Sequence, residues 1–120
     1  MKNKSNDFSD RLLSFGVNVI RLDQLLGKTA VGRHIANQLL RSATSAGANY
    51  EEACAAESRA DFVHKLQIVL KECRESLYWL KLTKKAQLTA GELIESLEQE
   101  ARELCNIIGK SVTTAKDRRR

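Results

Sequence analysis

Proline is absent from this chain, and glycine and aromatic residues are scarce. Its 120 residues include no proline, six glycines, three phenylalanines, two tyrosines and one tryptophan. Proline breaks helix interiors and glycine weakens them, whereas the plentiful Ala, Leu, Glu, Lys and Arg favour helix. The composition therefore predicts an all-α protein, and the length suits one domain with a modest core.

Long apolar runs are missing as well. No stretch approaches the roughly 18 apolar residues of a membrane helix, and the segment MKNKSNDFSD at the N-terminus lacks the apolar region of a signal peptide. We therefore expect a cytoplasmic protein with no membrane partner. Cys54, Cys73 and Cys105 are odd in number and far apart, which favours free buried thiols over disulfides or a metal site.

Catalytic and metal-binding signatures are scarce. Di-iron bundles need Glu-x-x-His twice, whereas only Asp61-Phe-Val-His64 has similar spacing, and it occurs once. A glycine-rich phosphate loop is also lacking. We expect no catalytic residue, no metal and no cofactor. The weakest of three hypotheses is an enzyme that uses Glu52, His64 and Glu75.

Hydrophobic spacing predicts four helices and a short tail. In the first helix, apolar residues from Phe8 to Leu26 recur every three or four positions, and Thr29, Ser58 and Thr89 are suited to cap the later helices. Short connections make successive helices antiparallel neighbours, so we expect an antiparallel up-down-up-down four-helix bundle. The expected helices cover about 7–27, 30–57, 59–86 and 90–115, with a basic tail at 116–120.

The third helix is apolar on two sides. One side, from Phe62 to Leu80, makes a complete core face. Ile68, Trp79 and Leu82 fall on roughly the opposite side, where they would form an exposed apolar patch on a monomer. Such patches usually mark interfaces, so these three residues are the predicted oligomer interface.

Basic residues follow a stripe between those two faces. Positions 59–86 hold seven basic and three acidic residues, whereas 87–115 hold two basic and five acidic ones, within a net charge of +5. Such a stripe, with Tyr78 for stacking, can grip phosphates as single-strand binders do; the alternative is an ordinary solvated face. The candidate nucleic-acid contacts are Lys71, Arg74, Lys81, Lys85, Arg118, Arg119 and Arg120.

The second helix carries a polar stripe from Gln38 to Glu52. If the chain turns near residue 58, antiparallel partners have numbers that sum to about 116, which pairs Arg41 with Glu75, Asn49 with Gln67 and Glu52 with His64. We expect these groups to form a structural network of hydrogen bonds, with a small-ligand or catalytic cleft as the alternative. The predicted network comprises Arg41, Ser45, Asn49, Glu52, His64 and Glu75.

One third of the chain carries a family pattern: an Arg-Ser or Arg-Arg start, Ser-x-Gly-Ala-Asn-x-x-Glu, an Asp-Phe-x-x-Lys corner and Lys-Glu-x-x-Glu-Ser-x-Tyr-Trp-Leu. The matching residues are Arg41, Ser42, Ser45, Gly47, Ala48, Asn49, Glu52, Asp61, Phe62, Lys65, Lys71, Glu72, Glu75, Ser76, Tyr78, Trp79 and Leu80. This pattern resembles the bacterial four-helix-bundle proteins first recognised as encoded within intervening sequences of 23S ribosomal RNA genes.

The resemblance implies a homopentamer, a ring-like barrel of short bundles. It also implies a relation to the basic pentameric accessory protein of diversity-generating retroelements, which looks like a nucleic-acid binder. The family supplies no agreed biochemical activity. The leading hypothesis is therefore a non-catalytic oligomer that binds RNA or another nucleic acid, and the alternative is a protein-interaction scaffold with no nucleic-acid role.

Overall fold

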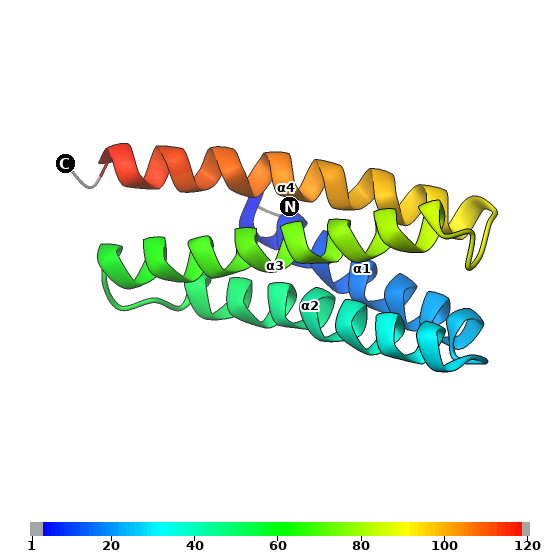
Figure 1. Cartoon of the computed structure of the whole chain (residues 1–120). Coiled ribbons are helices and arrows are strands. Elements are labelled where there is room, and N and C mark those ends of the chain that lie inside the picture. The colour runs from blue at the N-terminus through cyan, green and yellow to red at the C-terminus, as the bar shows by residue number, and fades with distance from the viewer. Residues whose placement is uncertain (1–3, 119–120) are drawn as a thin grey trace.

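A computed structural model describes the backbone of residues 4–118 and the side chains of residues 7–118. Every regular element within this range is a helix, and the predicted all-α four-helix bundle is confirmed. The four elements, shown in Figure 1, are α1 (Lys4–Leu26), α2 (Ala30–Cys54), α3 (Arg59–Lys85) and α4 (Glu92–Arg118).

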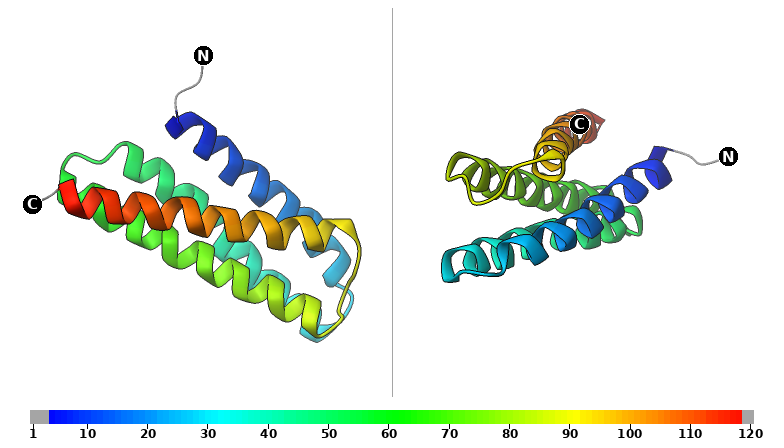
Figure 2. Two further views of the ribbon diagram at one scale, coloured as in Figure 1. Left: turned by 90° about the horizontal axis from the view of Figure 1, so that it is seen from above. Right: turned by 90° about the vertical axis from the view of Figure 1, so that its right-hand side faces the viewer.

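The helices form a closed ring of neighbours. Each packs against the helix before it in the sequence, and α1 also packs against α4. In Figure 1 each helix doubles back along its predecessor, and Figure 2 shows that α1 is inclined to the helices beside it. Across residues 4–118, no helix combines the length and the apolar character that crossing a membrane requires.

The core follows the inner stripes that the sequence predicts. In α1, every third or fourth residue from Phe8 to Leu26 is buried. The inner face of α2 consists largely of small residues (alanine, glycine and serine), which let α1 and α3 approach closely, while α3 and α4 supply larger aliphatics. Burying one Leu or Ile stabilises the fold by about 1.5–3 kcal/mol. The largest fully buried side chains include Leu12, Leu22, Leu39, Leu66, Leu80, Ile94, Leu97, Leu104 and Ile108.

Two of the three predicted N-caps are confirmed. The Thr29 hydroxyl accepts a hydrogen bond of 3.0 Å from the Gly32 backbone N–H at the start of α2. Ser58 accepts one of 3.0 Å from Asp61 N–H at the start of α3. The expected cap at Thr89 is wrong, because α4 begins only at Glu92.

The turn that ends α3 explains this difference. Gln87 adopts a left-handed backbone with φ of 57°, and its N–H donates to Lys84 O at 3.0 Å. The next N–H, of Leu88, reaches back to Thr83 O at 3.1 Å. These two bonds form a Schellman motif, and Leu88 packs against the core. Because this turn extends to Leu88, the residues directly after it connect the two helices, and α4 begins at Glu92.

The remaining helix limits differ from the prediction by a few residues. α1 starts at Lys4, α2 stops at Cys54 and α4 continues to Arg118. The predicted basic tail is therefore wrong for residues 116–118, which are helical, since neither proline nor glycine follows the buried Ala115. Arg119 and Arg120 lie outside the described residues.

Candidate nucleic-acid interface

Four cations and one tyrosine share the outward face of α3. Lys71, Arg74, Tyr78, Lys81 and Lys85 are all exposed, and they recur at intervals of three or four residues. This spacing keeps them on one side of a helix. The fourteen steps from Lys71 to Lys85 span about 21 Å at 1.5 Å per residue. We call the four cations the basic stripe.

Other lysines of α3 are paired, whereas the basic stripe is not. Lys65 Nζ lies 2.8 Å from Glu52 Oε1, and Lys84 Nζ lies 2.8 Å from Glu95 Oε1. Each carboxylate accepts a hydrogen bond from its lysine and thereby raises the pKa of that ammonium group. Among the described residues, no cation of the basic stripe has a carboxylate oxygen within 4.0 Å. Lys71 and Lys81 act on Glu75 and Glu98 only by charge attraction at longer range, which contributes to the lowered pKa of those carboxylates.

The arginines at the C-terminus do not join this stripe. Arg118 is exposed and lines a shallow depression with Arg59, at the beginning of α3. Lys85 is the last residue of α3, and the two ends of that helix lie at opposite ends of the bundle (Figure 1). Arg119 and Arg120 fall outside the described residues. The structure therefore groups Lys71, Arg74, Lys81 and Lys85, and it separates Arg118 from them.

An aromatic cluster crosses from α3 to α2 beside the stripe. The rings of Tyr78 and Trp79 meet edge to face, with centroids 5.1 Å apart, and Trp79 meets the His34 ring at 6.0 Å. Trp79 Nε1 donates a hydrogen bond of 3.0 Å to Glu75 Oε2. Trp79 is thus fixed on two sides, while Tyr78 is 57% exposed.

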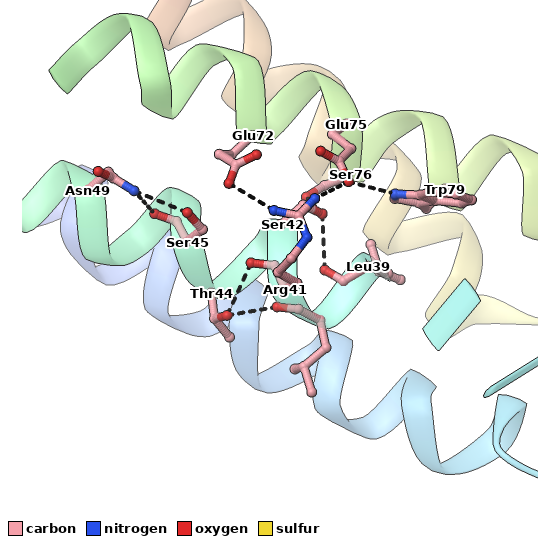
Figure 3. Close-up of polar contacts among 11 residues, drawn as sticks. Leu39, Arg41, Ser42, Thr44, Ser45, Asn49, Glu72, Glu75, Ser76 and Trp79 are labelled. Atoms are coloured by element: carbon pink, nitrogen blue, oxygen red, sulfur yellow. Dashed lines mark hydrogen bonds and ion pairs between the residues drawn. The ribbon is translucent and has the colours of Figure 1, made fainter. Parts of the chain in front are cut away.

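Arg41 ties α2 to α3, as Figure 3 shows. Its guanidinium bonds Glu75 Oε2 and also reaches Glu72 Oε2 at 3.2 Å. Donation from Arg41, and then from Trp79, lowers the pKa of Glu75, and the same bond to Glu75 raises the pKa of Arg41. The predicted pair of Arg41 and Glu75 is confirmed.

Beneath this pair lies a buried contact that sequence reasoning missed. The Ser42 and Ser76 hydroxyl oxygens are 2.8 Å apart, and both residues are buried (Figure 3). Ser42 Oγ donates to Leu39 O at 3.1 Å, which leaves Ser76 as the donor to Ser42. The antiparallel sum of about 116 would pair Ser42 with residue 74, two positions before Ser76, so spacing alone indicates only the neighbourhood of this contact.

The other two predicted pairs are wrong. Asn49 donates to Ser45 O at 2.9 Å and to Ser45 Oγ at 3.0 Å, both on its own helix, because its short amide reaches local acceptors first. The longer Lys65, instead of His64, reaches Glu52. His64 and Gln67 are exposed.

The enzyme hypothesis requires Glu52, His64 and Glu75 to lie together, and each has a different environment in the structure. Glu52 is engaged by Lys65, Glu75 is engaged by Arg41, and His64 points to solvent. The described residues do not bring Glu52, His64 and Glu75 together.

The predicted exposed patch on α3 is not found. Ile68, Trp79 and Leu82 are each partly buried, and Trp79 packs against the core in the angle between α3 and α2. Their predicted role as an oligomer interface stays a prediction.

Large exposed aliphatics gather on α1 instead. Leu13, Val17 and Ile20 are 70%, 42% and 46% exposed, and we call them the outer stripe. They border a groove of about 540 Å³ against Gly47 and Ala48 of α2. Their spacing of four and then three residues was readable in the sequence, beside the inner stripe of the same helix.

The cysteines and acidic groups form no metal site in the described part of the chain, where no cluster of three potential ligands occurs. Burial raises the pKa of Cys73 to about 12, and it also raises the pKa of Cys105. Such thiols are poor nucleophiles and poor metal ligands. Cys54 is exposed, contrary to prediction, because α2 ends at this residue.

The fold and the site define a helical bundle with one unpaired basic face. The chain matches the family model of the 23S rRNA-intervening sequence protein over residues 4–110, and it belongs to that family. The predicted resemblance is confirmed. Comparison with curated proteins finds no match.

A solved structure is similar along nearly its whole length. It is the crystal structure of a protein with unknown function from the S23 ribosomal protein family of Bacteroides thetaiotaomicron. The two chains share 36% sequence identity with a TM-score of 0.84, over 92% of this chain and 99% of that one.

Proposed function

We propose that this protein is a non-catalytic nucleic-acid-binding protein, with RNA as its first candidate ligand, and that the basic stripe of α3 is its contact surface. The observation that carries the proposal is that only some of the cations of α3 form ion pairs with carboxylates. Lys65 and Lys84 are held by carboxylates, whereas the four cations of the basic stripe have none within ion-pair distance among the described residues.

A polyanion supplies the missing counter-charges. The basic stripe runs for about 21 Å along α3, and a strand of duplex carries one phosphate per roughly 3.4 Å of axis. Each neutralised phosphate releases condensed counterions, so affinity for a single strand falls with salt at a log–log slope of about −0.7 per phosphate. Phosphate contacts carry no sequence information, so this surface alone supports binding to many sequences.

The test measures binding of a labelled single-stranded RNA as a function of salt. Replacing Lys71, Arg74 and Lys85 by Gln should weaken binding and flatten the log–log slope by about two units for each subunit in contact, since three phosphate contacts are lost. Fluorescence anisotropy between about 50 and 200 mM salt gives both quantities.

A matched control separates the surface from net charge alone. Replacing Arg21, Lys28 and Lys110 by Gln removes the same three charges from exposed positions off the basic stripe. This variant should keep most of the wild-type slope. Equal losses of affinity and of salt slope in the two variants would contradict the proposal. So would the absence of RNA binding by the wild-type protein at low salt.

We also propose that the chain assembles with further copies of itself, as the family resemblance implies. The support is the outer stripe of α1, because monomers seldom leave neighbouring Leu, Val and Ile side chains beside an open groove. The same exposed surface is the specific observation that favours the alternative function, a protein-interaction scaffold without a nucleic-acid role.

Light scattering tests the assembly. Leu13→Glu with Val17→Glu should lower the solution mass towards that of one chain, whereas Ser14→Glu, exposed on the same helix but off the stripe, should not. Circular dichroism should show unchanged helix content. If Trp79→Glu dissociates the oligomer and the α1 variant does not, the interface lies instead at the position that the sequence analysis indicated.

A further inference from the structure

Tyr78 is the exception among the aromatic side chains. Six aromatic residues occur in the chain, all within the described range, and Tyr78 is the exposed one, at 57%. The three others with the least exposure are Phe8, Phe15 and Tyr50, at 8% or below. An exposed tyrosine ring offers a flat apolar face to solvent, which a nucleobase is able to cover.

The ring also lies at the centre of the basic stripe. Lys81 and Arg74 lie three residues after and four residues before Tyr78, and Lys85 and Lys71 lie seven residues after and before it. One pair is about 5 Å from Tyr78 along the helix axis, and the other is about 10 Å away. A strand with one base on this ring therefore meets cations in both directions along its backbone.

The Tyr78 ring packs against a side chain that is itself held in place. Trp79 meets it edge to face at 5.1 Å, and Trp79 itself is held by its hydrogen bond to Glu75 and by its contact with His34. Glu75 is fixed in turn by Arg41. A platform held in this way loses little conformational entropy when a base covers it.

We propose that Tyr78 is a base-stacking residue, and that the basic stripe takes single-stranded nucleic acid with one unpaired base against this ring. The inference rests on the proposed function and narrows its ligand class. In a duplex the bases already stack on one another, so their faces are not available to a side chain. Stacking on an aromatic side chain tolerates any base, which agrees with a surface built from phosphate contacts.

The experiment compares two probes that carry the same phosphates. One is a labelled oligouridylate of about twelve nucleotides, and the other is an abasic strand of the same length and sugar. At about 50 mM salt the wild-type protein should bind the base-bearing strand about 5- to 150-fold more tightly, as expected for one stacked base. Equal affinity for the two strands overturns the inference.

Three variants locate the effect. Tyr78→Ala should lower affinity for the base-bearing strand to that for the abasic strand, and it should leave the abasic affinity and the salt slope unchanged. Tyr78→Phe should keep the preference. Gln67→Ala, exposed on the same side of α3, is the matched control and should also keep it. A preference that survives Tyr78→Ala overturns the inference.

A second measurement does not depend on affinity. Trp79 is the single tryptophan of the chain and touches Tyr78. Its emission should therefore change when the base-bearing strand is bound to saturation and stay constant with the abasic strand. Oligouridylate and oligodeoxyuridylate differ only in the sugar, so the tighter of the two identifies RNA or DNA as the ligand.

Failure of this inference is distinguishable from failure of the proposed function. Strong, salt-dependent binding of both strands with equal affinity leaves the phosphate-binding proposal standing and removes the stacking role of Tyr78. Absence of binding to both strands at low salt removes the proposed function itself, and the inference with it.

Discussion

Where the chain passes from α1 into α2, the close approach of the two helix ends depends on Gly32. It is buried in the first turn of α2, where that helix leaves the end of α1. A Cβ atom added to Gly32 would lie 1.9 Å from the carbonyl oxygen of Leu26, and no side-chain movement relieves contact with a backbone atom. This position therefore needs glycine for space rather than for an unusual backbone angle.

Gly32→Ala should destabilise the protein by about 1–3 kcal/mol, because the two helix ends must separate to admit a methyl group. Gly109→Ala, in the interior of α4 with nothing within 4 Å of the added atom, should instead stabilise it by about 0.5–1 kcal/mol. Urea unfolding followed by circular dichroism measures both. A change of the same sign in the two variants would refute this account.

At the scale of elements, polar contacts fix how α2 and α3 slide against each other. The pairs Arg41–Glu75, Ser42–Ser76 and Glu52–Lys65 have residue numbers that sum to 116, 118 and 117. The buried serine pair matters most for register, since a displaced α3 would separate the buried Ser76 hydroxyl from its acceptor, Ser42 Oγ. Alanine-rich surfaces alone would tolerate such sliding more easily.

This pairing makes part of the stability depend on pH. The pKa of Glu75 is lowered in the folded protein by donation from Arg41 and then Trp79. A carboxylate with a lowered pKa contributes stability above its unfolded pKa of 4.5, and that contribution is lost as the pH falls through the folded pKa. Glu75→Gln should therefore cost about 1 kcal/mol at pH 7 and should lose less stability on acidification than the wild-type protein.

Thermal unfolding at several pH values between about 7 and 3 measures this difference. Glu57→Gln, at an exposed position in the connection between α2 and α3, is the control. Its stability should follow the wild-type pH dependence. Parallel curves for Glu75→Gln and the wild-type protein would show that the Arg41 pair does not contribute to acid sensitivity.

The sequence predicts helices better than side-chain partners. Periodic burial in α1, the caps at Thr29 and Ser58 and the pairing of Arg41 with Glu75 follow from spacing, because a helix converts sequence distance directly into position. Spacing does not predict whether His64 or Lys65 binds Glu52. The two residues are adjacent, and the sum of residue numbers cannot show which side chain is long enough to reach the carboxylate.

The candidate site shows the same division. The placement of Lys71, Arg74, Lys81 and Lys85 on one face is visible in their spacing. Their lack of partners is not, because it depends on which carboxylates of other helices come near. The partial burial of Trp79 could not be predicted for a related reason, because it depends on how closely α2 and α3 approach each other.

For the whole molecule, Arg11 closes the ring of helices. It pairs with Glu100 at 2.5 Å and with Glu103 at 3.0 Å, between residues 89 and 92 positions apart in the sequence. Hydrogen bonds from Gln99 and Arg11 lower the pKa of Glu103, and the pair with Glu100 raises the pKa of Arg11. The other contacts between helices join helices that follow one another in the sequence. The contact between α1 and α4 therefore joins the two helices that lie farthest apart along the chain.

Arg11→Met should accelerate unfolding about fivefold and leave the refolding rate nearly unchanged, since contacts between distant segments form late and the pair contributes about 1 kcal/mol. Stopped-flow measurements in urea give both rates. Arg21→Met, which loses only a hydrogen bond to Asn18 on the same helix, should alter neither rate. A slower refolding rate for Arg11→Met would place the closure of the ring before the main barrier.

The basic charge of α3 and the acidic charge of α4 make the two sides of the molecule electrostatically different. α3 holds seven basic and three acidic residues, whereas α4, which packs beside it, holds four basic and six acidic ones. This separation amounts to an electric dipole across the short axis of the bundle. In the field of a polyanion such a body rotates before it makes contact, so that α3 leads and α4 trails. The orientation that binding needs is thus selected during diffusion, and added salt reduces the rate of capture as well as the strength of the complex.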